Sequence, residues 1–161
     1  LRIALATVKG IAYEWGVPVV GISTLHANAA RVDADGFICS LLDARKQEVY
    51  AALFRRAGKV LTRVSDDAVL SVSRVSELLS RCGAINPLLI GDGAQAYQKQ
   101  LNDSFAGALR FAAGDEFGSV AAQAALLARQ RIVAAAGDDL GVLAPLYLRP
   151  SEAESTRFLP R

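Results

Sequence analysis

The sequence has no methionine, a single histidine and only two cysteines. Zinc sites need several histidine or cysteine ligands at defined spacing, which His26, Cys39 and Cys82 do not provide, so no metal or other cofactor is expected. Isolated cysteines favour buried, reduced thiols and a cytoplasmic protein. The first residues also lack the basic leader and small-residue cleavage site of a signal peptide.

Long apolar runs and an excess of one charge are absent too. No run approaches the roughly 18 residues of a membrane span. The 18 basic and 16 acidic residues are interspersed and leave a net charge of +2, which does not by itself indicate a nucleic-acid or membrane surface. With 161 residues and 52% hydrophobic composition, the chain suits one compact domain or two small lobes around a buried core.

Residues 1–15 predict a helix that is covered on two sides. At about 100° per residue, Arg2, Lys9 and Tyr13 fall on one narrow strip, and apolar residues occupy most of the remaining circumference. A helix packed on one surface needs an apolar stripe of only about 100°. We therefore expect its own sheet on one side and something else on the other, with Gly16 ending the helix.

The chain opens inside this apolar helix, at Leu1, and offers no residue to cap the first turn. We therefore expect that an upstream segment is missing from the sequence. A frayed start to a complete domain is the alternative.

After the helix, the patterns predict a short buried strand at 17–22 and a short helix at 23–32 that Ser23 and Thr24 can cap. The polar stretch 33–36 is the expected lobe boundary. The next strand is expected at 37–42, followed by a turn at 43–46.

The second part of the chain predicts a meander followed by two αβ units. The strand at 47–55 alternates, with Val49, Ala51 and Leu53 on one face and Tyr50, Ala52 and Phe54 on the other. The remaining expected elements are a strand at 59–64, a helix at 73–81, a strand at 87–90, a helix at 94–101, a strand at 108–111 and a helix at 119–135. Right-handed crossovers would place the later strands parallel to the first, beside the meander.

This element order resembles the ribonuclease-H-like lobe of the actin–hexokinase superfold. We therefore expect a two-lobed α/β protein whose first lobe is incomplete. The expected division is 1–34 for the remainder of the N-terminal lobe, 35–145 for the C-terminal ribonuclease-H-like lobe, and 146–161 for a tail.

Three places suit chemistry, and each also has a structural explanation. Gly91-Asp92-Gly93 lies between a strand and a helix, where phosphates can bind, but it matches no nucleotide-binding motif and suits a tight turn. His26 has no partner ligand in the sequence and fits a surface or interface position better than a metal site. A Gly-x-Ser-x-Gly elbow, which would support a catalytic triad, is missing.

Asp43, Arg45 and Glu48 surround the first hairpin turn. Two neighbouring carboxylates can act as acid and base. Because Arg45 between them would keep both ionised, an ion-paired turn with a structural or partner-contact role is the simpler interpretation.

Both ends of the chain are expected to make contacts. A polar strip on a broadly apolar helix sets the register of an interface, so the first helix is predicted to pair with a partner. The residues predicted for that surface are Arg2, Leu5, Lys9, Ala12 and Tyr13. Tyr147-Leu148-Arg149 combines an apolar anchor with a guanidinium and is expected to dock back onto the first lobe.

Taken in order, these residues resemble the bacterial TsaB (YeaZ) family. The motifs are R-I-x-x-A-x-x-K-G-x-A from Arg2, G-I-S-T-L from Gly21, D-A-R-x-x-E-V-Y from Asp43, and the final Tyr147-Leu148-Arg149. The stretch 59–113 carries little motif. Family members usually have a strand with Asp-Thr-Ser, and Gly-Pro-Gly-Ser-Phe-Thr-Gly just before the helix that here starts at Leu1. Both are absent, which agrees with a missing upstream segment.

The resemblance implies a non-catalytic member of the system that makes threonylcarbamoyladenosine at position 37 of tRNAs reading codons that begin with A. In that system a paralogue, TsaD, holds the metal and nucleotide and pairs with TsaB-like proteins through first-lobe helices. An ATPase, TsaE, binds the pair, and homodimers through similar surfaces also occur. Asp43, Arg45 and Glu48 would then shape the inter-lobe region or meet the ATPase.

We therefore expect a scaffold that keeps a catalytic subunit competent, without direct tRNA contact because its charges are dispersed. The alternative is a kinase-like or ATP-hydrolysing enzyme of the same superfold, with phosphate at Gly91-Asp92-Gly93. Titration with nucleotide and magnesium would separate these two hypotheses. A homodimeric interaction protein is a third.

Overall fold

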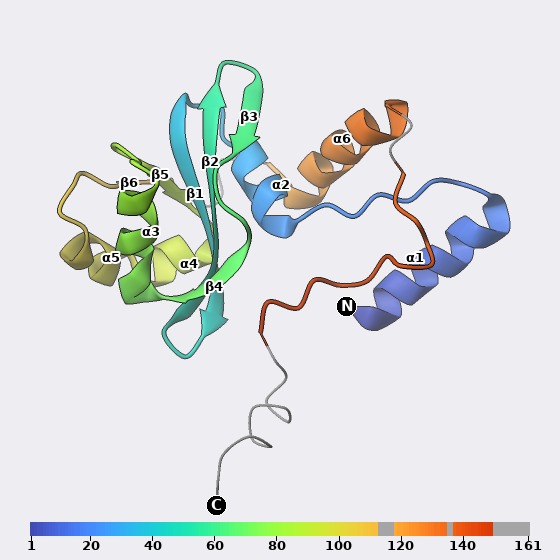
Figure 1. The fold of residues 1–161 in the computed structure, drawn as a ribbon, viewed down its shortest axis with the longest axis horizontal. Helices are drawn as coiled ribbons and strands as arrows, with labels where there is room; N and C mark the ends of the chain where they lie inside the picture. The colour runs from blue at the N-terminus through green and yellow to red at the C-terminus, as the bar shows by residue number, and fades with distance from the viewer. Residues whose placement is uncertain (113–117, 135–136, 150–161) are drawn as a thin grey trace, which may run out of the picture.

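A computed structural model describes residues 1–112, 118–134 and 137–149 and shows a mixed sheet with helices on both faces (Figure 1). Two helices precede the sheet, α1 (Arg2–Trp15) and α2 (Thr24–Ala30). The strands are β1 (Gly36–Arg45), β2 (Glu48–Ala57), β3 (Val60–Arg63), β4 (Ala68–Ser71), β5 (Leu88–Ile90) and β6 (Arg110–Phe111). The remaining helices are η1 (Val72–Arg74), α3 (Val75–Arg81), α4 (Asp92–Ala96), α5 (Gln98–Ser104) and α6 (Val120–Val133).

The sheet combines an antiparallel meander with a parallel extension. Its order is β3-β2-β1-β5-β6, and β4 pairs with β2 off this path. β2 is antiparallel to β1, β3 and β4, whereas β5 is parallel to both β1 and β6. The predicted meander and the predicted parallel strands beside it are therefore confirmed.

Strand β2 is buried on both faces, as its alternation predicts. Val49, Ala51 and Leu53 pack in one core with residues of α3 and α5. Ala52 and Phe54 pack in a second core with residues of α2 and β1. Helices on both faces of a sheet exclude water from both sets of side chains. This explains why β2 carries few charged residues before Arg55.

Several expected elements differ in the structure. Residues 17–22 form no strand, and Val17 is 45% exposed, because the segment has no neighbouring strand to pair with among the described residues. The first hairpin turn was expected at 43–46 but lies between Arg45, where β1 ends, and Glu48, where β2 begins. The register between β1 and β2 is irregular between Asp43 and Arg45. The helix expected at 94–101 is divided at Tyr97 into α4 and α5. β4 was not predicted, since it is only four residues long and partly buried throughout.

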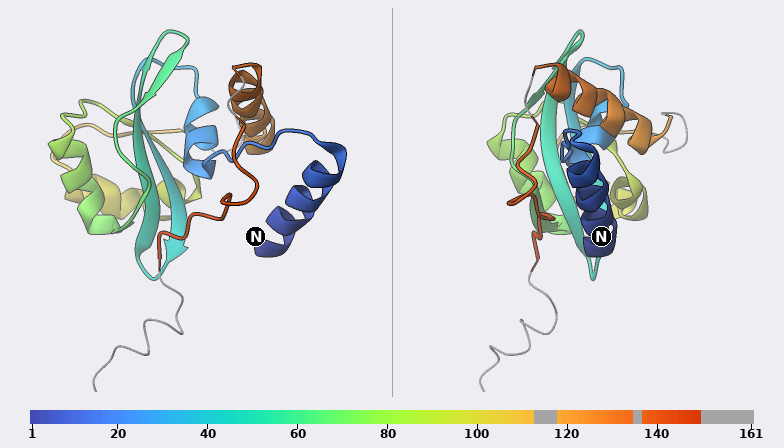
Figure 2. Two further views of the ribbon diagram at one scale, coloured as in Figure 1. Left: turned by 45° about the vertical axis from the view of Figure 1, so that its right-hand side comes forward. Right: turned by 90° about the vertical axis from the view of Figure 1, so that its right-hand side faces the viewer.

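Helix α1 has the predicted bounds but not the predicted neighbours. Gly16 ends it in a left-handed conformation, with φ at 61°. Figures 1 and 2 show the helix standing apart from the sheet, and Ala12 is its only buried residue. The expectation that its own sheet covers one side is therefore wrong.

Both cysteines are free, but only Cys39 is fully buried. Burial raises the pKa of the Cys39 thiol to about 12, so it stays protonated at neutral pH. Cys82 is partly exposed, so the prediction of two buried thiols holds for Cys39 alone. Among the described helices, none has the length and apolar character that crossing a membrane requires.

Candidate partner interface

The polar side of α1 contacts the segment 143–147 of the same chain. The Arg2 Nε donates a hydrogen bond to the Tyr147 hydroxyl at 3.0 Å, and the guanidinium carbon lies 5.2 Å from the centre of that ring. The Lys9 Nζ donates to the Leu143 carbonyl oxygen at 3.0 Å. Leu5 lines cavities together with this segment. Chain segment 143–147 therefore takes the place that the sheet was expected to fill.

The other side of α1 is an exposed apolar stripe, defined here as Ala4, Val8, Ile11 and Trp15. Steps of four, three and four residues place these side chains on one face of the helix. Trp15 is 74% exposed, Val8 48% and Ile11 47%. A contiguous apolar patch of this kind marks an interaction surface more often than scattered exposed residues do.

The five residues predicted for pairing are thus divided by the structure. Arg2, Leu5 and Lys9 face segment 143–147. Ala12 is only 3% exposed, whereas Tyr13 is 82% exposed. Of the five, Tyr13 has a largely exposed side chain in the described structure, and it lies on the polar strip, on the far side of the helix from the stripe.

The first hairpin holds Asp43 through hydrogen bonds. Asp43 Oδ1 accepts from the Arg45 backbone N–H at 2.8 Å and from the Tyr97 hydroxyl at 3.0 Å. The Arg45 guanidinium lies 3.3 Å from the other carboxylate oxygen but is 86% exposed. The backbone N–H of Arg45 is the largest cause that lowers the pKa of Asp43. An ionised Asp43 is as expected, but the main cause is the backbone of Arg45, not its charge.

Glu48 pairs with the C-terminal segment and not with Arg45. The Arg149 guanidinium lies 2.5 Å from Glu48 Oε2 and donates a hydrogen bond to the Ala44 carbonyl oxygen at 3.1 Å. The predicted docking of Tyr147-Leu148-Arg149 onto the first lobe therefore holds for Tyr147, which reaches α1. Arg149 instead reaches the hairpin between β1 and β2, within the range expected for the second lobe. Figure 1 shows this segment running beside α1 toward the lower end of the sheet.

Replacing Arg149 with alanine should lower stability modestly through this tie. A half-exposed ion pair with one further hydrogen bond contributes about 1 kcal/mol, or about 2–4 °C in Tm for a chain of this length. Arg45→Ala, which removes an exposed charge from the same hairpin, should change Tm by less than about 1 °C. A double-mutant cycle that combines Arg149→Ala with Glu48→Gln measures the coupling between the two residues. Additive effects on Tm would show that Arg149 and Glu48 are not coupled.

Asp138 ties residues 17–22 to the end of α6. Its carboxylate accepts from the Gly21 backbone N–H at 2.6 Å and pairs with the Arg131 guanidinium at 2.6 Å. The Asp138 backbone N–H donates to the Val19 carbonyl oxygen at 2.8 Å. These bonds satisfy polar groups of a segment that has no strand partner. The Gly21 N–H, followed by Arg131, lowers the pKa of Asp138.

This lowered pKa predicts a pH dependence. Ionised Asp138 stabilises the fold, so its contribution is complete above the unfolded pKa of about 3.9 and is lost as pH falls through the lower folded pKa. The Tm difference between the protein and Asp138→Asn should stay constant from pH 7 to about 5 and shrink below about pH 4. Thermal melts across that range measure it, and a difference that stays constant down to pH 2 would contradict the assignment.

The Gly91-Asp92-Gly93 turn packs against β1. A Cβ at Gly91 would lie 2.1 Å from the Leu41 carbonyl oxygen, and one at Gly93 would lie 2.9 Å from the Leu42 carbonyl carbon. Asp92 Oδ1 accepts from the Asp43 backbone N–H at 3.1 Å. The glycines therefore allow α4 to approach the strand closely, which favours the structural interpretation over phosphate binding.

His26 is half-buried on α2 and packs against the core. Its ring stacks on Phe54, with centroids 5.3 Å apart. Burial, followed by the charge of Arg63, lowers the pKa of His26 and keeps it neutral at pH 7. In the described part of the chain, no group of three or more histidine, cysteine or acidic side chains is arranged to hold a metal ion.

Comparison with known proteins gives related results at three levels. Residues 1–156 match the model of the family described as TsaD: tRNA N6-adenosine threonylcarbamoyltransferase. The tRNA threonylcarbamoyladenosine biosynthesis protein TsaB of Bacillus subtilis (strain 168) is 26% identical over 157 residues, which are 96% of this chain and 66% of that protein. This chain thus spans about two thirds of that relative.

Two solved structures from Pseudomonas aeruginosa share the fold. YeaZ has a TM-score of 0.66 at 20% identity, over 91% of this chain and 67% of that chain. An uncharacterized protein with similarity to peptidase YEAZ has a TM-score of 0.64 at 23% identity, over 92% and 67%. These likenesses and the family match over residues 1–156 together confirm the α/β architecture of the actin–hexokinase superfold. They also show that the chain belongs to the TsaD-type family, with the TsaB (YeaZ) proteins among its relatives.

Proposed function

We propose that this protein acts in threonylcarbamoyladenosine modification at position 37 of tRNA, as a non-catalytic partner that keeps a TsaD-type transferase subunit competent. The observation that carries the proposal is the exposed apolar stripe of α1. The relatives of this chain support the choice of pathway, since one is a tRNA threonylcarbamoyladenosine biosynthesis protein and the family is described as a transferase of that modification.

The stripe defines where the partner would pack. Arg2 and Lys9 are engaged by segment 143–147, which holds α1 from its polar side. The opposite side offers Val8, Ile11 and Trp15 at the spacing of an interhelical seam. A helix of the transferase subunit packed along this seam would bury apolar surface on both partners. Tyr13 shares the polar strip with Arg2 and Lys9 and would lie outside this contact.

The same seam would also serve a homodimer, since one helix face can pair with a copy of itself. Competition separates the two uses. If the transferase subunit binds through the stripe, adding it should convert homodimer into a 1:1 heterodimer. A heterodimer that forms without dissociating the homodimer would place the transferase contact elsewhere.

The first hairpin is proposed as a contact for a TsaE-type ATPase. Its tip presents the Arg45 guanidinium, which is 86% exposed, while Asp43 and Glu48 are held by Tyr97 and Arg149. An exposed cation at the tip of a hairpin suits a partner surface with carboxylates. Arg45→Ala should weaken ATPase binding to the pair without affecting pairing itself. Unchanged ATPase binding and modification would refute this contact.

Reconstituted modification tests the function. The expected result is that the transferase subunit and ATPase modify tRNA at position 37 only when this protein, at its natural length, is present. This protein alone should neither transfer the threonylcarbamoyl group nor hydrolyse ATP with magnesium. ATP turnover by the isolated protein would favour the kinase-like alternative, and modification that proceeds equally well without it would refute the scaffold role.

A further inference from the structure

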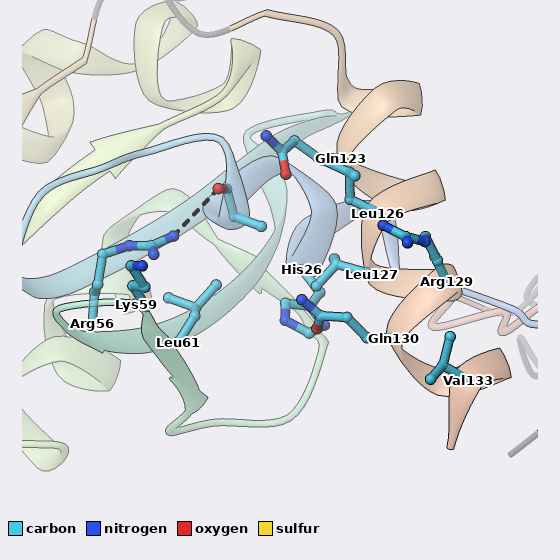
Figure 3. A pocket seen from close by; sticks show the side chains of 11 residues that line it. His26, Arg56, Lys59, Leu61, Gln123, Leu126, Leu127, Arg129, Gln130 and Val133 are labelled. Carbon is cyan, nitrogen blue, oxygen red and sulfur yellow. Dashed lines mark hydrogen bonds between the residues drawn. The ribbon is translucent and has the colours of Figure 1, made fainter. Parts of the chain in front are cut away.

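A groove of about 680 Å³ lies between α2, α6 and the hairpin of β2 and β3 (Figure 3). The described residues that line it include none from α1 or from the hairpin at Arg45. Arg56, Lys59 and Leu61 line it from the hairpin, and His26 and Ala30 from α2. The side from α6 includes Gln123, Leu127, Arg129 and Gln130. A volume of this size suits a small molecule.

The charges that line the groove are all positive. Arg56, Lys59 and Arg129 are its three charged lining residues, and no carboxylate is among the described residues that line it. Neither Lys59 nor Arg129 has a carboxylate partner in the described part of the chain. Arg56 and Leu61 are opposite each other in the pairing of β2 and β3, so their side chains share one face.

The Arg56 guanidinium is held in place, but only some of its hydrogen-bond donors have an acceptor among the described residues. One terminal nitrogen donates to the Ala30 carbonyl oxygen at 3.3 Å, which fixes the guanidinium against the end of α2. Its Nε is buried and has no hydrogen-bond partner among the described residues. A buried donor without an acceptor is costly, and an anionic oxygen is the acceptor that best suits a guanidinium.

The middle of the groove suits a flat heterocycle. His26 is stacked on Phe54 and also lines the groove, and Leu61 and Leu127 supply aliphatic surface. Figure 3 shows Gln130 beside His26, with Arg56 and Lys59 toward one end. Amide groups can hydrogen-bond the edge of a base, and a neutral imidazole can stack on its face.

We infer that this groove binds a free nucleoside monophosphate, with the phosphate at Arg56 and Lys59 and the base between His26, Leu61 and Leu127. Two cations at one end and apolar surface with a stacked imidazole in the middle suit a ligand that is anionic at one end and planar elsewhere. No metal is needed, because the two side chains neutralise the phosphate directly. This inference does not rest on the proposed partner function, since it concerns another face of the chain.

Calorimetric titration of the protein at its natural length with adenosine 5′-monophosphate and with adenosine tests the inference. The monophosphate should bind about tenfold or more tightly than adenosine, with or without magnesium. Lys59→Ala and Arg56→Gln should each reduce this preference to about threefold or less while leaving adenosine binding unchanged. Retained adenosine binding shows that the groove is still folded.

Arg55→Ala is the matched control. Arg55 is adjacent to Arg56 on β2, but its guanidinium lies over Phe37, 5.8 Å from the ring centre, on the opposite face of the sheet. It should leave the affinity for the monophosphate unchanged. Equal affinities for monophosphate and adenosine, no binding of either, equal losses in Arg55→Ala and Lys59→Ala, or binding of single-stranded RNA alone would each overturn the inference.

Discussion

Replacing Val8 with glutamate should abolish the 1:1 complex with the transferase subunit. The side chain lies in the middle of the α1 stripe and is 48% exposed in the chain alone. In the complex, the glutamate would be buried without a partner, in addition to the loss of an apolar contact. We expect at least a hundredfold rise in Kd, measured by light scattering on a gel-filtration column.

Two substitutions on the same helix serve as controls for Val8→Glu. Ile3→Glu introduces the same charge at a residue that is 84% exposed and lies outside the stripe, so it should change the Kd by less than about threefold. Tyr13→Glu tests the polar strip that the sequence predicts as part of the pairing surface. Because this strip lies on the far side of the helix from the stripe, Tyr13→Glu should change the Kd as little as Ile3→Glu does. If Tyr13→Glu abolishes pairing and Val8→Glu does not, the contact lies on the polar strip and not on the stripe.

Gly91→Ala is expected to give the largest loss of stability. The new Cβ would overlap the Leu41 carbonyl oxygen and lie 2.9 Å from Asn28 Nδ2, and Gly91 has a φ of +110° that other residues rarely adopt. Overpacking and backbone strain together cost about 3–5 kcal/mol. Tm should fall by about 10 °C or more, measured by thermal melting.

Gly58→Ala is the matched control for this prediction. Gly58 also has a positive φ, of +56°, but an added Cβ would meet nothing within 4 Å. The strain alone costs about 1 kcal/mol, or about 2–4 °C. Similar Tm values for the two variants would contradict a close approach of α4 to β1. A fully stable Gly91→Ala variant would also favour the alternative interpretation, in which the Gly91-Asp92-Gly93 turn binds a ligand.

The sheet could be predicted from sequence because its signals are local. Alternation at 47–55 describes a strand buried on both faces, and β2 has both faces in separate cores. Gly58 at a tight turn and the strand at 87–90 are likewise defined by adjacent residues. Chain order then fixes which strands are parallel, since right-handed crossovers leave few arrangements.

The failures involve contacts between residues far apart in the chain. The pattern at 17–22 suits a strand, but a strand also requires a neighbour, and Asp138 satisfies this segment's Gly21 N–H instead. Proximity in sequence predicts a pair between Glu48 and Arg45, whereas the partner of Glu48 is Arg149, about a hundred residues away. Local charge patterns do not reveal such pairs.

The candidate surfaces also combine local signals, which the sequence shows, with contacts between distant residues, which it does not. The apolar arc of α1 was evident on a helical wheel, but which part of it stays exposed depends on segment 143–147. The groove combines His26 with the hairpin near Arg56 and with α6 near Gln130. No motif spans three such separated segments, so sequence reasoning found His26 without its neighbours.

Light scattering on a gel-filtration column, with this protein at its natural length and the transferase subunit from the same source, tests the central claim most directly. The account predicts a new peak at the mass of a 1:1 complex, which disappears with Val8→Glu and persists with Ile3→Glu. Two separate peaks at the masses of the individual proteins, at concentrations well above the micromolar range, would contradict the account.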